Sequence, residues 1–364
     1  MKVKEIAEAI EAVAPLYLQE DFDNAGMQVG DLESEVDGAL LCTDVTEEVV
    51  DEAVERGIGL VISHHPLIFH GIKKIIGRNR VERIVAKALR HGVSIYSAHT
   101  SLDNARGGVN YKMAEKLGMT DVRILEPQRG TLRKLVVYVP TAQADAVEQA
   151  MHAAGAGHIG DYDSCSYRLS GEGRYRALEG ADPWAGEVGE HHVEPEVRVE
   201  VIMHKAQAGA VLRAMLKAHP YEEPAFDVIP LDNADAYSGS GVVGSIKPMA
   251  ALDFLRMTKE AFGTGAVRYS GTVDGVTVSR VALCGGAGSF LVPAAIASGA
   301  QVMVTGDVKY HEFQDAAPSI ILADIGHYES EHFTKEIFCD IIKKKNPNFA
   351  IYFAHSERNQ VNYL

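Results

Sequence analysis

The sequence predicts an α/β protein made of two similar, mostly parallel halves with a ferredoxin-like α+β domain inserted between them. Apolar runs typical of buried strands alternate with helical patterns from residue 38 to 118, and the alternation returns after residue 240. Between these stretches the order is close to strand, helix, two strands, helix and strand, which is the ferredoxin-like unit. The expected segments are an α/β half at 1–127, an inserted domain at 128–240 and a second α/β half at 241–364.

The first half starts with an amphipathic helix pattern and continues as a series of strands and helices. Apolar residues recur at helical spacing from Val3 to Val13, and the pattern stops before Pro15. A turn-rich stretch at 21–30 then leads into a short strand. The elements expected next are a strand at 39–43, a helix at 46–56, a strand at 58–63, a helix at 80–91, a strand at 93–98 and a helix at 107–118.

The middle segment has a different pattern and contains an acidic loop at 180–196 with glycine and proline residues. His191 and His192 fall in this loop, where we expect solvated side chains rather than a site. Gly155–Gly160 matches the letters of a dinucleotide-binding loop, but it follows a helix and opens none, so we assign it to a loop. The expected elements are a strand at 132–139, a helix at 142–153, strands near 164–170 and 173–178, a strand at 197–203, a helix at 206–218 and a strand at 225–230.

The segment after residue 240 carries signs of an internal duplication. Cys42 and Ser63 are separated by 21 positions, as are Cys284 and Thr305, and each pair marks the two strands of a strand-helix-strand unit. This spacing indicates two related halves, although so loose a match is also compatible with chance. The expected elements are strands starting at 282, at 302–305 and at 319–323, followed by a helix at 328–343.

Composition and charge exclude several classes of protein. The 46% hydrophobic and 23% charged residues are typical of a globular enzyme, and no segment approaches the roughly 20 uninterrupted apolar residues of a membrane span. The N-terminal residues lack a signal-like apolar core, so we expect a cytoplasmic protein. The four cysteines form no CxxC motif, which argues against a disulfide framework or a zinc finger. The net charge of -15 argues against nucleic acid as a partner.

His64 and His65 stand where a buried strand must stop. Inside a continuing strand their side chains would point to opposite faces, but Pro66 removes a ladder donor and holds His65 extended. The pair therefore emerges at the carboxyl end of a strand, where open α/β sheets place their ligands. Taken alone, the two histidines are equally compatible with a metal site and with a solvated strand end.

Other ligand-type residues fall at the same edge of the predicted sheets. Asp103 follows the next strand, while His327 and Glu331 are four residues apart at the start of a predicted helix and so share one face. Three imidazoles and two carboxylates are too many for one tetrahedral ion with an open position, but they suit two ions bridged by a carboxylate and a water. Such ligands fit zinc, iron, manganese or cobalt. The predicted ligands of two divalent ions per chain are His64, His65, Asp103, His327 and Glu331.

Two further groups of residues are candidates for supporting roles. One contains polar residues near the same strand ends, which would orient metal-bound histidines, contact substrate or simply stabilise turns; its members are His99, Asp307, His311 and Asp324. The other links a strand to a helix and is compatible with a phosphate-binding turn or with a tight turn that needs small residues; its members are Gly285, Gly286, Gly288 and Ser289.

Three stretches of the chain resemble the signatures of the Nif-three-like family, whose members are named GTP cyclohydrolase 1 type 2 homologues. They are residues 63–69, residues 99–110 and residues 326–331. Residues 157–162 and 219–225 are similar to the inserted domain of the longer bacterial members. The resemblance therefore covers nearly the whole chain, and the combination of motifs is highly specific.

The resemblance implies a di-metal site, a toroidal homohexamer and a PII-like or CutA-like insert. On the family pattern His65 and Asp103 would hold one ion, His64 and His327 the other, and Glu331 would bridge them. The chain departs from the family pattern twice, with Phe22 in place of a tryptophan and Ser101 in place of an asparagine. Both positions lie beside the ligands, so the departures bear on local packing or substrate contacts rather than on metal binding.

Two functions fit these expectations. The first is a metal-dependent hydrolase acting on a nucleotide-like substrate such as GTP, in which a metal-bridged hydroxide attacks an electrophilic carbon while His99 or His311 moves protons. The second is a non-catalytic metal-binding or metal-delivery protein regulated through its insert. Open coordination positions and a phosphate pocket at 285–289 would favour the hydrolase. Tightly bound but exchangeable metal without turnover would favour the second function.

Overall fold

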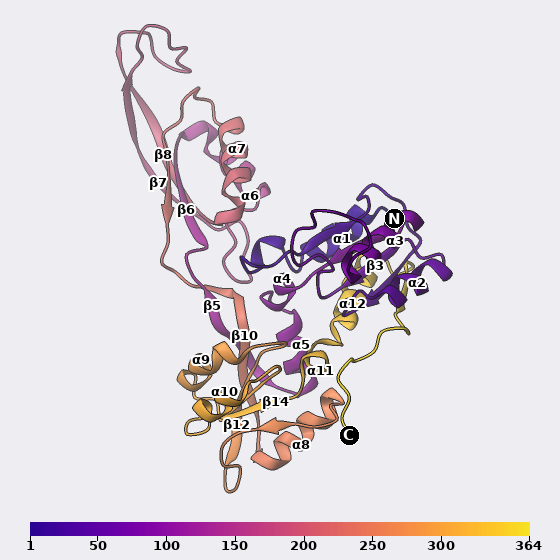
Figure 1. The fold of residues 1–364 in the computed structure, drawn as a ribbon. Helices are drawn as coiled ribbons and strands as arrows, with labels where there is room; N and C mark the ends of the chain where they lie inside the picture. Colours follow the sequence, from indigo (N-terminus) through magenta and orange to yellow (C-terminus); the bar gives the residue numbers. More distant parts are fainter. The chain divides into compact units, whose positions relative to one another are not determined.

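The computed structural model describes residues 1–364 and divides them into two compact units. One unit combines Met1–Pro127 with Tyr237–Leu364, and the other is Gln128–Ala236. Strands and helices of the α/β type make up the first unit, which confirms the predicted class (Figure 1). None of the helices has both the length and the apolar character that crossing a membrane requires.

The first sheet of the larger unit consists of five short strands. Its order is β1 (Gly26–Val29), β4 (Ser94–Ser97), β3 (Leu60–Ser63), β2 (Gly38–Cys42) and β15 (Ala350–Phe353). All neighbours pair in parallel except β1, which lies antiparallel to β4 at one edge. The strand β15, which was not predicted from the sequence, comes from the C-terminal end of the chain and completes this sheet beside β2.

The second sheet of the same unit has six strands. Its order is β11 (Arg268–Tyr269), β14 (Ile321–Asp324), β13 (Val302–Thr305), β12 (Thr277–Leu283), β10 (Asp235–Ala250) and β5 (Thr120–Gln128). The three central strands β12, β13 and β14 are parallel, whereas β10 pairs antiparallel with β12 and β11 pairs antiparallel with β14. Buried residues of both sheets, among them Ile62 and Val304, belong to one hydrophobic cluster. This shared core holds the two sheets together.

Helices connect the strands of both sheets, and local sequence signals set their ends. Asn79 caps the helix that follows β3, because its side chain accepts a hydrogen bond from the backbone N–H of Glu82, and Gly92 ends that helix in the left-handed conformation. The helices of this unit are α1 (Val3–Glu11), α2 (Glu47–Glu55), α3 (Arg80–His91), α4 (Thr100–Asp103), α5 (Val109–Lys116), α8 (Ala251–Phe262), α9 (Val292–Ala297), α10 (Tyr310–Ala316), α11 (His327–Glu331) and α12 (Thr334–Lys345).

The smaller unit is an antiparallel sheet covered on one face by two helices, α6 (Ala144–Ala153) and α7 (Ala208–Ala218), as Figure 1 shows. Its strand order is β7 (Ser166–Arg176), β8 (His191–His204), β6 (Leu132–Pro140) and β9 (Phe226–Pro230). Apolar residues of the sheet and of both helices, such as Val199, Met151 and Met215, form its own hydrophobic cluster.

Three details of the predicted elements were wrong. The strands expected near 164–170 and 173–178 are one continuous strand, β7, because every residue from Ser166 to Arg176 pairs with β8. His191 and His192 are the first residues of β8 rather than part of a loop, because that same pairing extends the strand. The helix expected at 328–343 is split into α11 and α12, where Phe333 turns into the core.

Candidate metal centre

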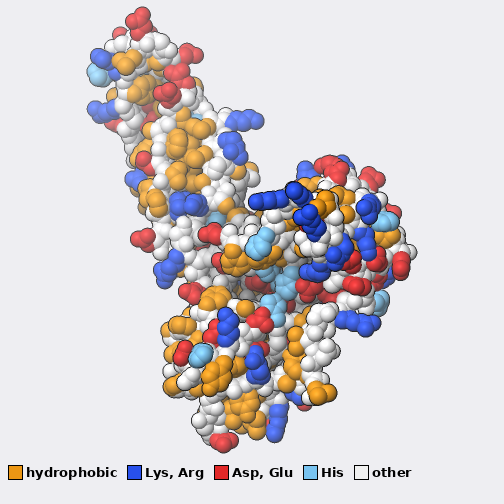
Figure 2. Space-filling view, in the orientation of Figure 1, with side chains coloured by type: hydrophobic (Ala, Val, Ile, Leu, Met, Phe, Trp, Pro, Cys, Tyr) orange, Lys and Arg blue, Asp and Glu red, His pale blue; other side chains and the backbone are white.

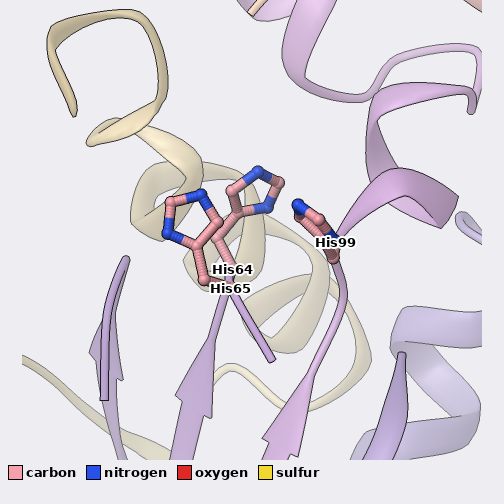
Figure 3. A group of neighbouring side chains, drawn as sticks. All are labelled: His64, His65 and His99. Carbon is pink, nitrogen blue, oxygen red and sulfur yellow. The ribbon is translucent and has the colours of Figure 1, made fainter. Parts of the chain in front are cut away.

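Two neighbouring parallel strands deliver three histidines to one place. His64 and His65 follow β3 directly, and His99 follows β4, so all three lie at the carboxyl ends of adjacent strands. Figure 3 shows the three rings facing a common space above these strand ends. The backbone N–H groups of His64 and His65 donate to the carbonyls of Cys42 and Thr43, which fixes the turn after β3.

The orientation of the His64 ring is set by a backbone contact. Its Nδ1 lies 2.9 Å from the carbonyl oxygen of Ala98, which leaves Nε2 directed into the site. The side chain is completely buried. Asp103, the last residue of α4, places its Oδ1 3.6 Å from this Nε2.

The second sheet contributes the other two ligand-type residues. His327 and Glu331 are the first and last residues of α11, which follows β14, and they lie one turn apart on the same face. Their closest atoms, Nε2 of His327 and Oε2 of Glu331, are 3.1 Å apart. The hydroxyl of Ser330 donates to the carbonyl of His327 and accepts from the N–H of Gly286, which anchors this short helix to the turn after β12.

The Glu331 carboxylate lies in the middle of the cluster. Its Oε2 is 2.9 Å from Nε2 of His65, and its Oε1 is 3.7 Å from Nε2 of His64. Nε2 of His65 and Nε2 of His327 are 3.2 Å apart. Figure 2 shows histidine side chains, in pale blue, gathered in a hollow of this unit with acidic side chains close by.

Two groups of potential metal ligands share Glu331. One group joins it to His65 and His327, and the other joins it to His64 and Asp103. The resemblance had implied a different pairing, with His65 beside Asp103 and His64 beside His327. The geometry groups them otherwise because β3 turns the two adjacent imidazoles in different directions, one toward α4 and the other toward α11.

The charges of the site compensate one another in the protein without metal. Burial by itself lowers the pKa of His65, but its hydrogen bonds with Asp44 and Glu331 raise it to about 10. The pKa of His327 is likewise raised to about 9, mainly by its hydrogen bond with Glu331 against the effect of burial. Despite its own burial, Glu331 has a pKa well below the usual range because the surrounding imidazoles stabilise its carboxylate.

His64 and Asp103, on the other side of the cluster, are not stabilised in their charged forms in this way. Burial lowers the pKa of His64, and burial together with the charge of Glu331 raises the pKa of Asp103 well above its usual range. Nε2 of His64 and Oδ1 of Asp103 are both buried and have no hydrogen-bond partner. Two ligand atoms that each lie roughly 2.1 Å from one tetrahedral ion are about 3.4 Å from each other, close to the 3.6 Å separation of these two atoms. The residues present therefore fit a divalent metal ion.

Carboxylates that the sequence analysis did not assign a role orient two of the histidines. Oδ1 of Asp44 lies 2.9 Å from Nδ1 of His65, and Oδ1 of Asp23 lies 2.8 Å from Nδ1 of His99. Asp307, which the sequence analysis did propose as a supporting residue, lies 2.7 Å from Nδ1 of His327. Metal-binding histidines commonly bond a carboxylate through the second ring nitrogen. Asp44 follows β2, so its position after a neighbouring parallel strand was the signal that could have identified it.

The remaining predicted residues have different positions. His311 is exposed on α10 and lines neither cavity that borders the cluster. Asp324 forms an ion pair with Arg268 and accepts from the backbone of Val308 and Gly326, so its contacts are structural.

The glycine turn after β12 uses its polar backbone groups within the protein. The N–H groups of Gly285, Gly286 and Gly288 donate to side chains of Asn110, Ser330 and Thr305, and the hydroxyl of Ser289 donates to Glu312. Its phosphate-binding role therefore stays a prediction that no contact supports.

A cavity of about 780 Å³ opens beside the cluster. His65, Asp103, His327 and Glu331 lie along its lining, and so does His99. The exposed aromatic rings of Phe22, Phe69 and Phe290 border it as well. A volume of this size accommodates a ligand as large as a nucleotide.

The fold and the site together define an α/β protein with a candidate metal centre built from residues that follow the carboxyl ends of β3, β4 and β14. A family model described as Duf34/NIF3 (NGG1p interacting factor 3) matches residues 1–360, and the chain belongs to this family.

Relatives of known sequence and structure agree with that assignment. The protein named GTP cyclohydrolase 1 type 2 homolog of Bacillus subtilis is 38% identical over 336 residues, which cover 92% of this chain and 90% of the relative. A protein of the same name from Staphylococcus epidermidis is 30% identical over the full length of both chains. The crystal structure of a Bacillus cereus protein related to NIF3 superposes with a TM-score of 0.84 and 34% identity, covering 100% of this chain and 99% of the other.

Proposed function

We propose that the chain is a metal-dependent hydrolase that acts on a nucleotide-like substrate and holds two divalent ions. The observation that carries the proposal is the pair of buried, unpartnered ligand atoms on His64 and Asp103 beside a cavity large enough for such a substrate. The names of the relatives, GTP cyclohydrolase 1 type 2 homologs, support GTP as the first substrate to examine. The proposed metal ligands are His64, His65, Asp103, His327 and Glu331.

Bound divalent ions would polarise an electrophilic substrate group and lower the pKa of a water molecule. The protein supplies the proton-handling group. Nδ1 of His99 is fixed by the Asp23 carboxylate, which orients the ring so that its other nitrogen is able to hold or release a proton toward the cavity. His311, the other candidate for this task, is not among the residues that line the cavity.

The aromatic side chains that line the cavity are suited to binding a flat, partly apolar substrate. The rings of Phe22 and Phe69 lie with their centroids 6.3 Å apart, and Phe290 is exposed at the same cavity. A purine base offers a planar face that stacks on such rings. Phe22, which stands where the family usually has a tryptophan, would keep this aromatic contact with a smaller ring.

Turnover of GTP by metal-loaded protein tests the hydrolase proposal. We expect formate release and loss of purine absorbance with the wild type, loss of both in His65→Ala through loss of metal, and loss of turnover with retained metal in His99→Gln. His91→Gln is the matched control because His91 is exposed on α3, away from the site. Equal background rates in all four proteins, with GTP and with other nucleotides, would contradict the hydrolase proposal.

The alternative is a metal-binding or metal-delivery protein without catalysis. The observation that favours it is the glycine turn, whose N–H groups donate to side chains of the protein instead of facing a phosphate. Two tightly bound, exchangeable ions together with no turnover of any nucleotide would support this function.

The domain organisation and assembly are proposals too. We infer that residues 128–240 are a ferredoxin-like insert between related α/β halves, and the compact unit Gln128–Ala236 with its strand order β7-β8-β6-β9 supports this. A match of 38% of the chain to CutA from Synechococcus elongatus has a TM-score of 0.23, so the PII-like or CutA-like character stays a prediction. The proposed homohexamer is tested by light scattering on the purified chain.

A further inference from the structure

The smaller unit contains a second cavity of about 430 Å³ that is independent of the metal centre. It opens between the sheet, the β7–β8 connection and the segment after α7, and all of its lining residues belong to the unit Gln128–Ala236. A cavity of this volume suits a small organic molecule.

Aromatic rings at steep angles to one another form one wall of the cavity. The ring centroids of Tyr175 and Tyr221 are 5.9 Å apart at an interplanar angle of 70°, and those of Trp184 and Tyr221 are 6.0 Å apart at 51°. At these angles the rings are not stacked in parallel, and all three line the cavity. The π face of an aromatic ring attracts the positive charge of an ammonium or guanidinium group.

A buried carboxylate faces the same space. Glu196 is only 8% exposed, yet it lines the cavity and forms no ion pair. Its Oε1 accepts a hydrogen bond of 2.8 Å from the Tyr221 hydroxyl, and its side chain has no other hydrogen bond. Burying a carboxylate without a cation is costly, so this group is arranged to receive one.

The space that Glu196 occupies depends on a glycine in the neighbouring strand. A Cβ atom at Gly173 would lie 2.2 Å from the carboxyl carbon of Glu196. Any larger residue at this position would therefore push the carboxylate away from its present place.

The rest of the lining adds negative charge. Glu222 and Glu223 are part of it, and the only cationic side chain among the lining residues, Arg174, is paired at 3.0 Å with Glu172. A carboxylate or phosphate ligand would meet uncompensated like charge here.

We propose that the cavity of the smaller unit binds a small organic cation, a quaternary ammonium or guanidinium compound, with its charge between the aromatic rings and Glu196. This site is distinct from the proposed hydrolytic function and does not depend on it. The insert would then respond to the concentration of such a cation.

Trp184 is the only tryptophan of the chain and lines this cavity, so fluorescence excited selectively at tryptophan, and not at the tyrosines, reports on the cavity. We would titrate the full-length protein with choline and with agmatine, and in parallel with 3,3-dimethylbutan-1-ol, which has the shape of choline without its charge. A saturable fluorescence change with at least one cation, and a far weaker response to the alcohol, is the expected result. No saturable change with either cation, or an equal response to choline and the alcohol, would overturn the proposal.

Two variants test whether cation binding depends on the charge of Glu196 in particular or on the negative charge of the surface in general. Glu196→Gln should weaken cation binding about tenfold or more, because it removes the charge and keeps the shape. Glu187→Gln, an exposed residue of the same connecting loop, is the control and should bind as the wild type does. If Glu196→Gln fails to fold by circular dichroism, calorimetric titration of Trp184→Ala takes its place, since Trp184 lies in an exposed loop. Wild-type affinity in the folded variant would contradict the proposal.

Discussion

Nε2 of His64 and Oδ1 of Asp103 lie 3.6 Å apart in the interior of the protein, and neither has a hydrogen-bond partner. An unsatisfied buried polar atom typically costs about 1–3 kcal/mol of folding free energy. The Glu331 carboxylate lies close to the same two atoms, with its Oε1 3.7 Å from Nε2 of His64. A divalent ion that bound all three groups would remove this cost, which is why we propose the pair as metal ligands.

Asp103→Asn should separate stability from metal binding. In protein stripped of metal, the substitution removes a buried carboxyl group that faces Glu331, so the free energy of unfolding should stay equal or rise by about 1 kcal/mol. The increase in melting temperature on adding metal should shrink. Calorimetric scans with and without chelator measure both quantities. A full metal-induced increase in the variant would show that Asp103 is not a ligand.

Asp44→Asn should weaken metal binding without changing the number of ions. Its carboxylate orients His65 through Nδ1, and loss of such a contact typically reduces metal affinity about 10–100-fold. Competition with a fluorescent chelator measures the affinity. Asp51→Asn is the control, because Asp51 forms only a surface ion pair with Lys87. Equal metal affinities of the two variants would show that Asp44 does not support metal binding.

Gly286→Ala should abolish metal binding at the Glu331 position. Gly286 has a φ of 59°, and a Cβ atom there would lie 2.4 Å from Oε1 of Glu331, which must then move. Gly118→Ala is matched in conformation, with a φ of 62°, but its Cβ would meet no atom within 4 Å. Both variants should lose about 1 kcal/mol from backbone strain, and only the first should lose metal. The metal content of the two purified variants decides this, and equal content would contradict the prediction.

The Asp23–His99 pair should make stability depend on acid pH. Against the effect of burial, hydrogen bonds from His99 and Thr100 lower the pKa of Asp23 from 3.8 to about 2. The unfolded chain therefore binds more protons between these values, so the contribution is complete above about pH 4 and is lost as the pH falls toward 2. The contribution amounts to about 2 kcal/mol.

Urea unfolding of the wild type and of Asp23→Asn checks this dependence. The difference in unfolding free energy between them should be largest near neutral pH and should shrink below pH 4. A difference that stays constant down to pH 2 would mean that the Asp23 carboxylate has an ordinary pKa.

The sequence predicted the α/β class and most elements of the first half, because strands and helices there follow strong periodic patterns. Every expected element between 39 and 118 is present with ends within two residues of the prediction. The strand β15 was missed because its partner, β2, lies about 300 positions away in the sequence, and no local pattern records such a pairing. The long hairpin of β7 and β8 was missed because Gly171 and Gly173 interrupt the strand pattern, although pairing continues through them.

The ligand-type residues could be found from sequence because each follows a strand end. Their grouping could not, because the directions of the His64 and His65 rings depend on contacts with Ala98 and Asp44 that only the folded chain provides. His311 was placed among the candidates because it closely follows the strand at 302–305, but the structure places it on α10 with its side chain exposed.

The metal content of the purified protein tests the central claim most directly. Inductively coupled plasma mass spectrometry should give close to two equivalents of divalent metal per wild-type chain and less than one in Glu331→Ala, because this carboxylate contacts both ligand groups. Glu336→Ala, which removes a surface partner of Lys116, should keep both ions. Retention of two ions in Glu331→Ala, or no more than one ion in the wild type, would contradict the proposed two-ion centre.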